Sequence, residues 1–109
     1  MCLKSISIAF LVAGAVLLKA PGWAQWLGDA KHGSVLVFST CLPCHGVRKG
    51  EKSANPQAPS FTTIARIKGL SEKAINVTLQ SPPHAMPKIR LDPQQRADVV
   101  AYILSLKAD

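Results

Sequence analysis

The stretch Cys41-Leu42-Pro43-Cys44-His45 decides the fold of this chain. Two Cys at positions i and i+3 project from one side of a turn, so both sulfurs can add to the two vinyl groups of one porphyrin. The next residue, His45, is then held beneath the iron, where an imidazole nitrogen can bind the metal. The pattern is that of covalent haem attachment, and we expect one haem c held through two thioethers.

Three other uses of the two Cys remain as alternatives. A dithiol redox pair would favour a βαβ context, and the sequence has no strand pattern to provide one. Structural zinc needs four ligands, and His32, His45 or His84 could complete a set with the two Cys, but the paired spacing of such sites is absent. Free thiols fit poorly with an exported protein, because exposed dithiols tend to oxidise outside the cytosol.

An apolar block over residues 6–18, preceded by Lys4, predicts that the protein is exported. The block is too short to cross a membrane, which takes about 20 residues, and Lys19 ends it. Gly22 and Ala24 provide small residues for cleavage before Gln25. We therefore expect residues 1–24 to be a secretory signal peptide, with a retained membrane anchor as the alternative, and the mature protein to be periplasmic.

The remaining residues, 25–109, form at most one domain. Loss of Lys4 and Lys19 lowers the net charge from +7 to +5. Domains of this size often need a disulfide, metal or cofactor to complete the core, and two Cys three residues apart could close only a trivial loop. The mature chain is not expected to be an integral membrane protein. An exported haem protein without a base-stacking surface is also not expected to bind nucleic acid.

Capping residues and apolar periodicity predict an all-α fold. Asp29, Ser71 and Asp92 can each cap a helix, and the last helix also has Pro93 at its first position and Gln95 to complete a capping box. The expected helices cover residues 29–40, 60–66, 71–81 and 92–106. Residues 46–59 are expected to form a surface loop, and the proline-rich residues 82–93 an extended loop.

Met86 is the candidate for the sixth iron ligand, since it is the only Met after residue 24. Pro87 favours an extended backbone at Met86, and a thioether there would reach iron with little further ordering. His84, two residues earlier, is the main competitor because imidazole also binds iron well. His32 is expected to face solvent from the first helix.

On these features the chain resembles the class I cytochromes c over most of residues 28–107. The resemblance rests on Gly33 and Val37 before the attachment motif, Ala58-Pro59 and Met86-Pro87 after it, and the final Arg96-Ala-Asp-Val-Val-Ala-Tyr102-Ile run. It implies first and last helices that cross, with shorter helices and loops around the haem. It also implies a hydrogen bond from His45 to the Pro59 carbonyl, and crossing of Gly33 and Val37 by Val99 and Tyr102. Val37 is a departure, because the family often has an aromatic residue there.

The resemblance implies a monomeric one-electron carrier, not an enzyme, whose iron cycles between ferric and ferrous. A haem subunit docked on a dehydrogenase and an open-iron gas-binding protein are the alternatives. Five cations follow the two ligand motifs and are expected to ring the haem edge, although an ordinary solvated surface would have the same composition: Arg48, Lys49, Lys52, Lys88 and Arg90. Such a ring would steer the carrier towards acidic faces of a reductase, dehydrogenase or oxidase.

Overall fold

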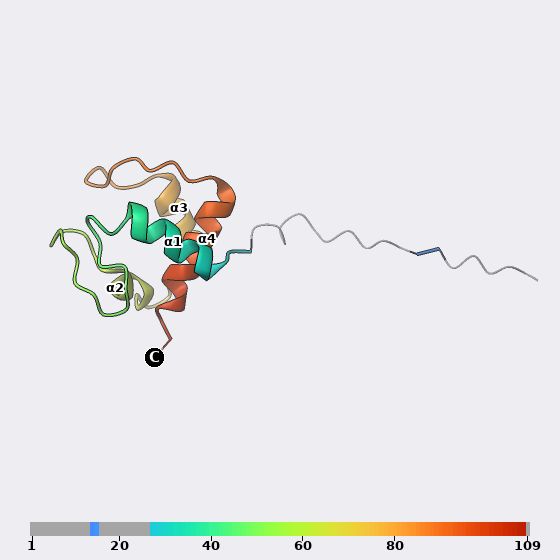
Figure 1. Cartoon of the computed structure of the whole chain (residues 1–109), viewed down its shortest axis with the longest axis horizontal. Helices are drawn as coiled ribbons and strands as arrows, with labels where there is room; N and C mark the ends of the chain where they lie inside the picture. The colour runs from blue at the N-terminus through green and yellow to red at the C-terminus, as the bar shows by residue number, and fades with distance from the viewer. Residues whose placement is uncertain (1–13, 16–26, 109) are drawn as a thin grey trace, which may run out of the picture.

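The computed structural model describes residues 14–15 and 27–108, and this part of the chain contains helices and no strands (Figure 1). The helices are α1 (Ala30–Thr40), α2 (Phe61–Ala65), α3 (Glu72–Gln80) and α4 (Pro93–Ser105). The all-α prediction is confirmed, and each helix lies within the range expected from the sequence. The predicted signal peptide lies almost entirely outside the described residues.

Three of the helices begin at a side chain that accepts a backbone N–H from the first turn. Asp29 Oδ1 accepts from Lys31 at 2.8 Å, while Ser60 and Ser71 accept from the residue three positions later, both at 3.1 Å. These bonds satisfy N–H groups that have no partner within the helix. Short polar side chains therefore fix where α1, α2 and α3 begin.

The start of α4 has the predicted capping box. Asp92 Oδ1 accepts the Gln95 N–H at 2.8 Å, and Gln95 Oε1 accepts the Asp92 N–H at 3.0 Å. Pro93 occupies the first turn, where its missing N–H costs no helical hydrogen bond. The proline-rich segment before α4 therefore ends at a defined residue.

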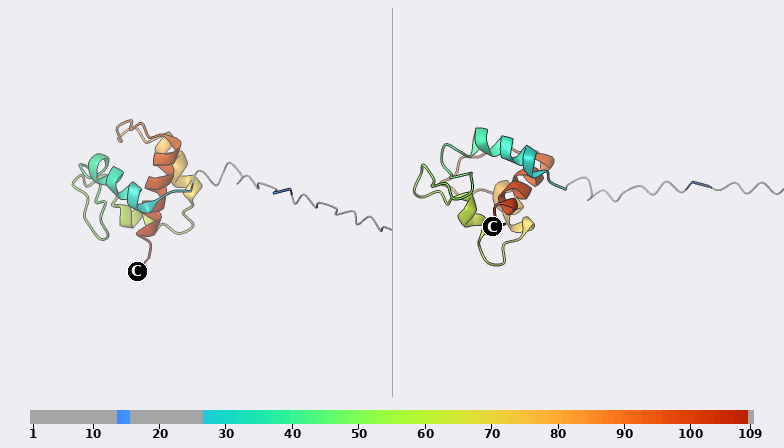
Figure 2. Two further views of the ribbon diagram at one scale, coloured as in Figure 1. Left: turned by 45° about the vertical axis from the view of Figure 1, so that its right-hand side comes forward. Right: turned by 60° about the horizontal axis from the view of Figure 1, so that its bottom comes forward.

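Helices α1 and α4 cross in close contact, as Figure 2 shows from two directions. A Cβ atom at Gly33 would lie 2.0 Å from the Asp98 carbonyl oxygen and 3.0 Å from Tyr102 Cβ. Only a glycine allows the two helices to lie this close. The prediction that they cross at Gly33 because it lacks a side chain is therefore confirmed. Tyr102, one of the two residues expected to cross Gly33 and Val37, is among the nearest neighbours of Gly33, together with Asp98.

The core lies around α4, against which α1, α2 and α3 all pack. Val37 of α1 and Val99 of α4 are almost fully buried, and the smaller Val37 fits where the family often has an aromatic residue. Val47, in the loop expected at the surface, is also fully buried. The remaining buried apolar residues are Phe61, Ala65, Ile75, Val100, Ile103 and Leu106. This core fixes the end of α1, which leads directly into Cys41.

In the part of the chain that the structure describes, no helix combines the length and the apolar character needed to cross a membrane.

Candidate functional site

The attachment motif forms a turn that continues from α1. The N–H groups of Cys44 and His45 both donate to the Cys41 carbonyl, at 3.2 and 2.9 Å, and the Cys41 N–H donates to Val37 at 2.9 Å. Cys41 and Cys44 are free thiols, not a disulfide. The α1 helix thus holds both sulfurs and His45 in one compact turn.

The imidazole of His45 is held in place on two sides. Its Nδ1 lies 2.7 Å from the Pro59 carbonyl oxygen, and its ring packs against Phe61 with the ring centroids 5.2 Å apart. A carbonyl oxygen can only accept, so this geometry requires the hydrogen on Nδ1. The Nε2 lone pair is then free to bind a metal.

Backbone contacts hold the loop after the motif close to it. The Phe61 N–H donates to the Gly46 carbonyl at 2.8 Å, and the Asn55 N–H donates to the Cys44 carbonyl at 3.1 Å. A Cβ at Gly46 would lie 2.1 Å from the Glu51 carbonyl oxygen. The sequence analysis missed Gly46, although a Gly directly after the motif was a visible signal for a close approach of two backbones.

Tyr102 connects α4 to the same loop. Its hydroxyl donates to the Val47 carbonyl at 2.6 Å, and its ring lies edge-on to Phe38 of α1, with centroids 6.2 Å apart. Burial raises the pKa of the Tyr102 phenol, so the group stays protonated and remains a donor at neutral pH. Tyr102 therefore helps to fix the position of the loop that contains Pro59.

The Cys41 thiol is mostly buried at the end of α1. Burial, and to a smaller extent the neighbouring Cys44, raises the pKa of Cys41 to about 11. At neutral pH Cys41 is therefore a neutral thiol that packs like a small apolar side chain.

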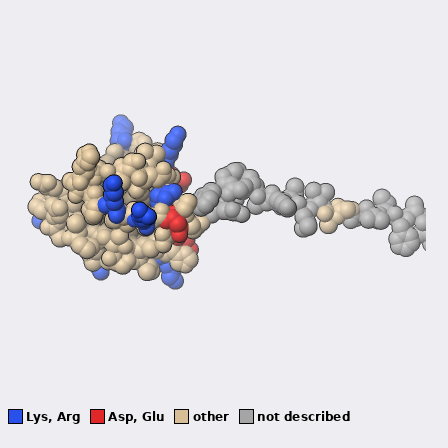
Figure 3. All heavy atoms as spheres, turned by 90° about the horizontal axis from the view of Figure 1, so that it is seen from above, with Lys and Arg blue, Asp and Glu red and all other residues tan. Residues whose placement is uncertain are grey.

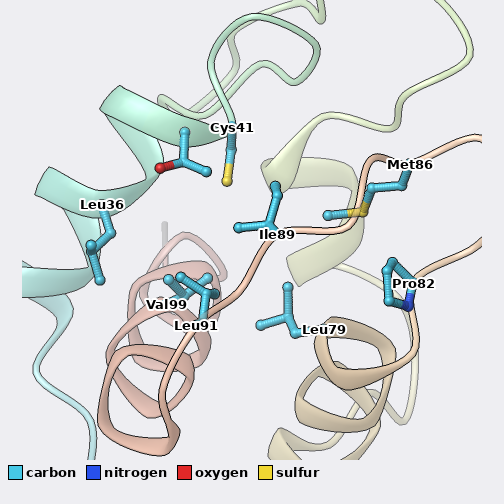
Figure 4. Close-up of a pocket in the computed structure, with 9 residues that line it drawn as sticks. Leu36, Cys41, Leu79, Pro82, Met86, Ile89, Leu91 and Val99 are labelled. Carbon is cyan, nitrogen blue, oxygen red and sulfur yellow. The ribbon is translucent and has the colours of Figure 1, made fainter.

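An apolar pocket brings Cys41 and Met86 together. Figure 4 shows Cys41 on one side of Ile89 and Met86 on the other. The other lining residues are Leu36, Thr40, Leu79, Pro82, Leu91 and Val99. The lining is almost entirely apolar and therefore favours an apolar ligand.

The segment that contains Met86 differs in part from the extended loop expected. The Met86 N–H donates to the Pro83 carbonyl at 2.9 Å, which closes a turn, and the chain runs without helix from Pro87 to Asp92. Pro82 and Pro83 before Met86, and Pro87 after it, restrict the backbone on both sides of this residue, because the proline ring fixes one backbone angle. Met86 is half-buried and faces the pocket, whereas His84 is exposed and does not line it.

The donor set fits a haem. The turn after α1 provides two thiols and an imidazole with a free Nε2, and the apolar pocket provides the thioether of Met86; these groups can attach a porphyrin and bind its iron. The dithiol redox pair and structural zinc find no support among the described residues, which include no strand for a thioredoxin-like unit and no cluster of three or more His, Cys, Asp or Glu that could hold a metal. His32 is exposed on α1, as expected.

Comparison with known proteins agrees with this geometry. Residues 30–107 match the protein family Cytochrome c. The chain belongs to the cytochrome c family. It is 35% identical over 79 residues to cytochrome c-552 of Bradyrhizobium diazoefficiens, an alignment that covers 72% of this chain and 76% of the relative. The all-α architecture with crossing first and last helices is that of a class I cytochrome c.

Two of the five cations expected to ring the haem edge make contacts within the protein. Arg48 stacks on the Phe38 ring at 4.7 Å and pairs with Glu51 at 3.0 Å, and Lys49 donates to the Ala108 carbonyl near the C-terminus. Both cations are thus bound to the protein's own groups. Figure 3 shows Lys and Arg side chains spread over the visible face, not gathered in one patch. All five cations of the expected ring are exposed, including the three others, Lys52, Lys88 and Arg90.

Proposed function

We propose that this cytochrome c carries single electrons on one haem, attached as thioethers to Cys41 and Cys44. His45 Nε2 and Met86 Sδ would bind its iron. The arrangement around His45 carries the proposal, because the Pro59 carbonyl fixes Nδ1 as the protonated nitrogen and leaves Nε2 for iron. Each thioether would form by addition of S–H across a vinyl double bond, with the hydrogen going to the other vinyl carbon.

The bound haem would supply an iron that cycles between ferric and ferrous. The protein's part is to keep both ligands in place in both states, so that little reorganisation accompanies each transfer. The Pro59 and Phe61 contacts fix the His45 ring, and the turn at Pro83 fixes Met86. Apolar side chains from α1, α3 and the Met86 segment exclude water, which with methionine ligation favours the ferrous state.

A carrier is favoured over an enzyme or a gas-binding protein, because two protein ligands leave no open position on the iron. We propose that the mature chain begins at Gln25 in the periplasm and acts as a monomer. Lys52, Lys88 and Arg90 would then favour partners with acidic faces, and the rate of their association would fall with salt.

Two measurements on the purified protein test this proposal. Intact-mass analysis should give the chain from Gln25 plus one haem that survives denaturation, and Cys41→Ala or Cys44→Ala should leave only one thioether. Optical spectra should show a far-red sulfur-to-iron band in the ferric state, as Met86 ligation requires. A colourless protein with the mass of the bare chain would overturn the haem assignment. A spectrum of two histidine ligands would overturn Met86 and favour His84.

A further inference from the structure

The guanidinium group of Arg96, on α4, binds two other parts of the protein at once. Its Nε donates to Asn76 Oδ1 of α3 at 3.1 Å, and its Nη1 donates to the Leu91 carbonyl at 2.7 Å. Leu91 belongs to the segment that connects Met86 to α4. Both hydrogen bonds are partly buried, so water competes with them less than at an exposed site.

Few other hydrogen bonds hold this segment. Among the described residues, the Met86 N–H bonds to Pro83 within the segment, and the Arg96 contact with Leu91 is the hydrogen bond that ties residues 82–91 to another element. Pro82, Pro83 and Pro87 have no N–H to donate. The remaining attachment is apolar, through side chains that line the pocket. Arg96 therefore restrains the Met86 segment relative to both α3 and α4.

We infer that Arg96 is a positioning residue that keeps Met86 on the iron and so sets how readily an outside ligand replaces it. This inference rests on the proposed ligation by Met86. The exchange itself is a substitution: the sulfur leaves ferric iron, a nitrogen of added imidazole binds, and the oxidation state does not change. Release of the sulfur requires the segment to move outward, and the bond from Arg96 to Leu91 opposes that movement.

The test uses the haem-loaded protein with two substitutions. Arg96→Lys keeps the positive charge but replaces the guanidinium, which donates from two nitrogen atoms, by a single ammonium group. Asn76→Ala removes only the contact with α3. Stopped-flow mixing of the ferric protein with imidazole follows loss of the far-red band. We expect displacement to be about tenfold faster in Arg96→Lys, equivalent to about 1.4 kcal/mol, and faster by a smaller factor in Asn76→Ala.

Two control variants separate this role from general stability. Arg90→Lys changes an exposed cation in the Met86 segment and should react with imidazole at the unaltered rate. Ile103→Val shortens a buried side chain of α4 that does not line the pocket, and should lower the melting temperature without changing the displacement rate.

The outcomes are distinct. Faster displacement in the Arg96 and Asn76 variants alone supports the inference. An unchanged rate in Arg96→Lys overturns it, as does equal acceleration in Ile103→Val, which would make Arg96 merely structural. Should Arg96→Lys yield no haem protein, an unchanged rate in Asn76→Ala overturns the inference and a faster rate supports it. Absence of the far-red band from the unaltered protein would overturn Met86 ligation itself, before any substitution is made.

Discussion

His45 Nδ1 and the carbonyl oxygen of Pro59 lie 2.7 Å apart, although 14 residues separate them in the sequence. The contact orients the imidazole and increases the electron density on Nε2, because the Nδ1 hydrogen is partly drawn towards the carbonyl. A more electron-rich ligand stabilises ferric iron more than ferrous iron. With the proposed haem bound to His45, the loop after the motif would therefore adjust the reduction potential as well as hold the ring.

Replacement of Pro59 by Gly should raise the reduction potential. The carbonyl remains, but the backbone that aims it becomes free to move, so the hydrogen bond weakens and the ferric state loses support. We expect the potential to increase by roughly 30 mV. This is about a threefold change in the ferric–ferrous equilibrium constant, because a tenfold change corresponds to about 59 mV. Redox titration measures this shift. Pro56→Gly, at an exposed position in the same loop, should leave the potential unchanged, and an equal shift there would contradict the role given to Pro59.

Replacement of His45 by Ala should abolish the stable haem protein. The same side chain is the proposed ligand and a packing partner of Phe61, so ligation and completion of the core fail together. Haem staining after denaturing electrophoresis and far-UV circular dichroism report the two effects. His32→Ala, at an exposed position on α1, should mature normally. A compact, stable His45→Ala chain without haem would show that the core does not depend on the cofactor.

Replacement of Gly33 by Ala should destabilise the protein by about 3 kcal/mol. In a solvent-exposed helix the same change would stabilise the protein by up to about 1 kcal/mol. Whether Gly33→Ala stabilises or destabilises the protein therefore depends on the crossing with α4. The new Cβ would meet the Asp98 carbonyl, a backbone atom that cannot rotate away. Denaturant titration measures the free energy of unfolding. Val35→Ala, on the exposed side of the same helix, should change it little, and a stabilised Gly33→Ala protein would contradict the observed packing.

Replacement of Tyr102 by Phe should lower the free energy of unfolding by about 1 kcal/mol, since the buried Val47 carbonyl loses its donor. Burial raises the pKa of Tyr102 in the folded protein, so the unfolded chain releases this proton first as pH increases. The contribution of Tyr102 to the free energy of unfolding is complete below the pKa of Tyr in the unfolded chain, about 10. It is lost as pH rises through the pKa of Tyr102 in the folded protein. Melting curves should show a constant difference between the two proteins up to about pH 9, shrinking above pH 10. A difference that grows with pH would contradict this.

Much of the fold could be predicted because its signals are local. A helix start depends on one side chain and an N–H two or three residues later, so Asp29, Ser71 and Asp92 marked their helices correctly. The resemblance to the class I cytochromes c, which rests in part on Gly33, likewise implied the crossing with α4. The motif itself indicated the ligand class, since its chemistry lies within five consecutive residues.

The interactions that were missed join residues far apart in the sequence. The buried Asp98 accepts the Asp29 N–H at 2.8 Å across 69 residues, and no local pattern indicates that contact. The engagement of Arg48 by Phe38, and of Lys49 by Ala108, also depends on where α1 and the C-terminus lie. Counts of charged residues therefore overstated the free basic surface.

The bond between Asp29 and Asp98 also restricts the order in which the domain can assemble. Closing a loop of 69 residues costs conformational entropy that local helix formation does not recover, so α1 cannot be locked until the last helix has been synthesised. Until then the attachment motif lies in an unclosed chain, with both thiols accessible. We expect a chain that ends before residue 93 to keep both thiols accessible throughout, so the proposed porphyrin addition would have to precede the meeting of the two ends of the domain.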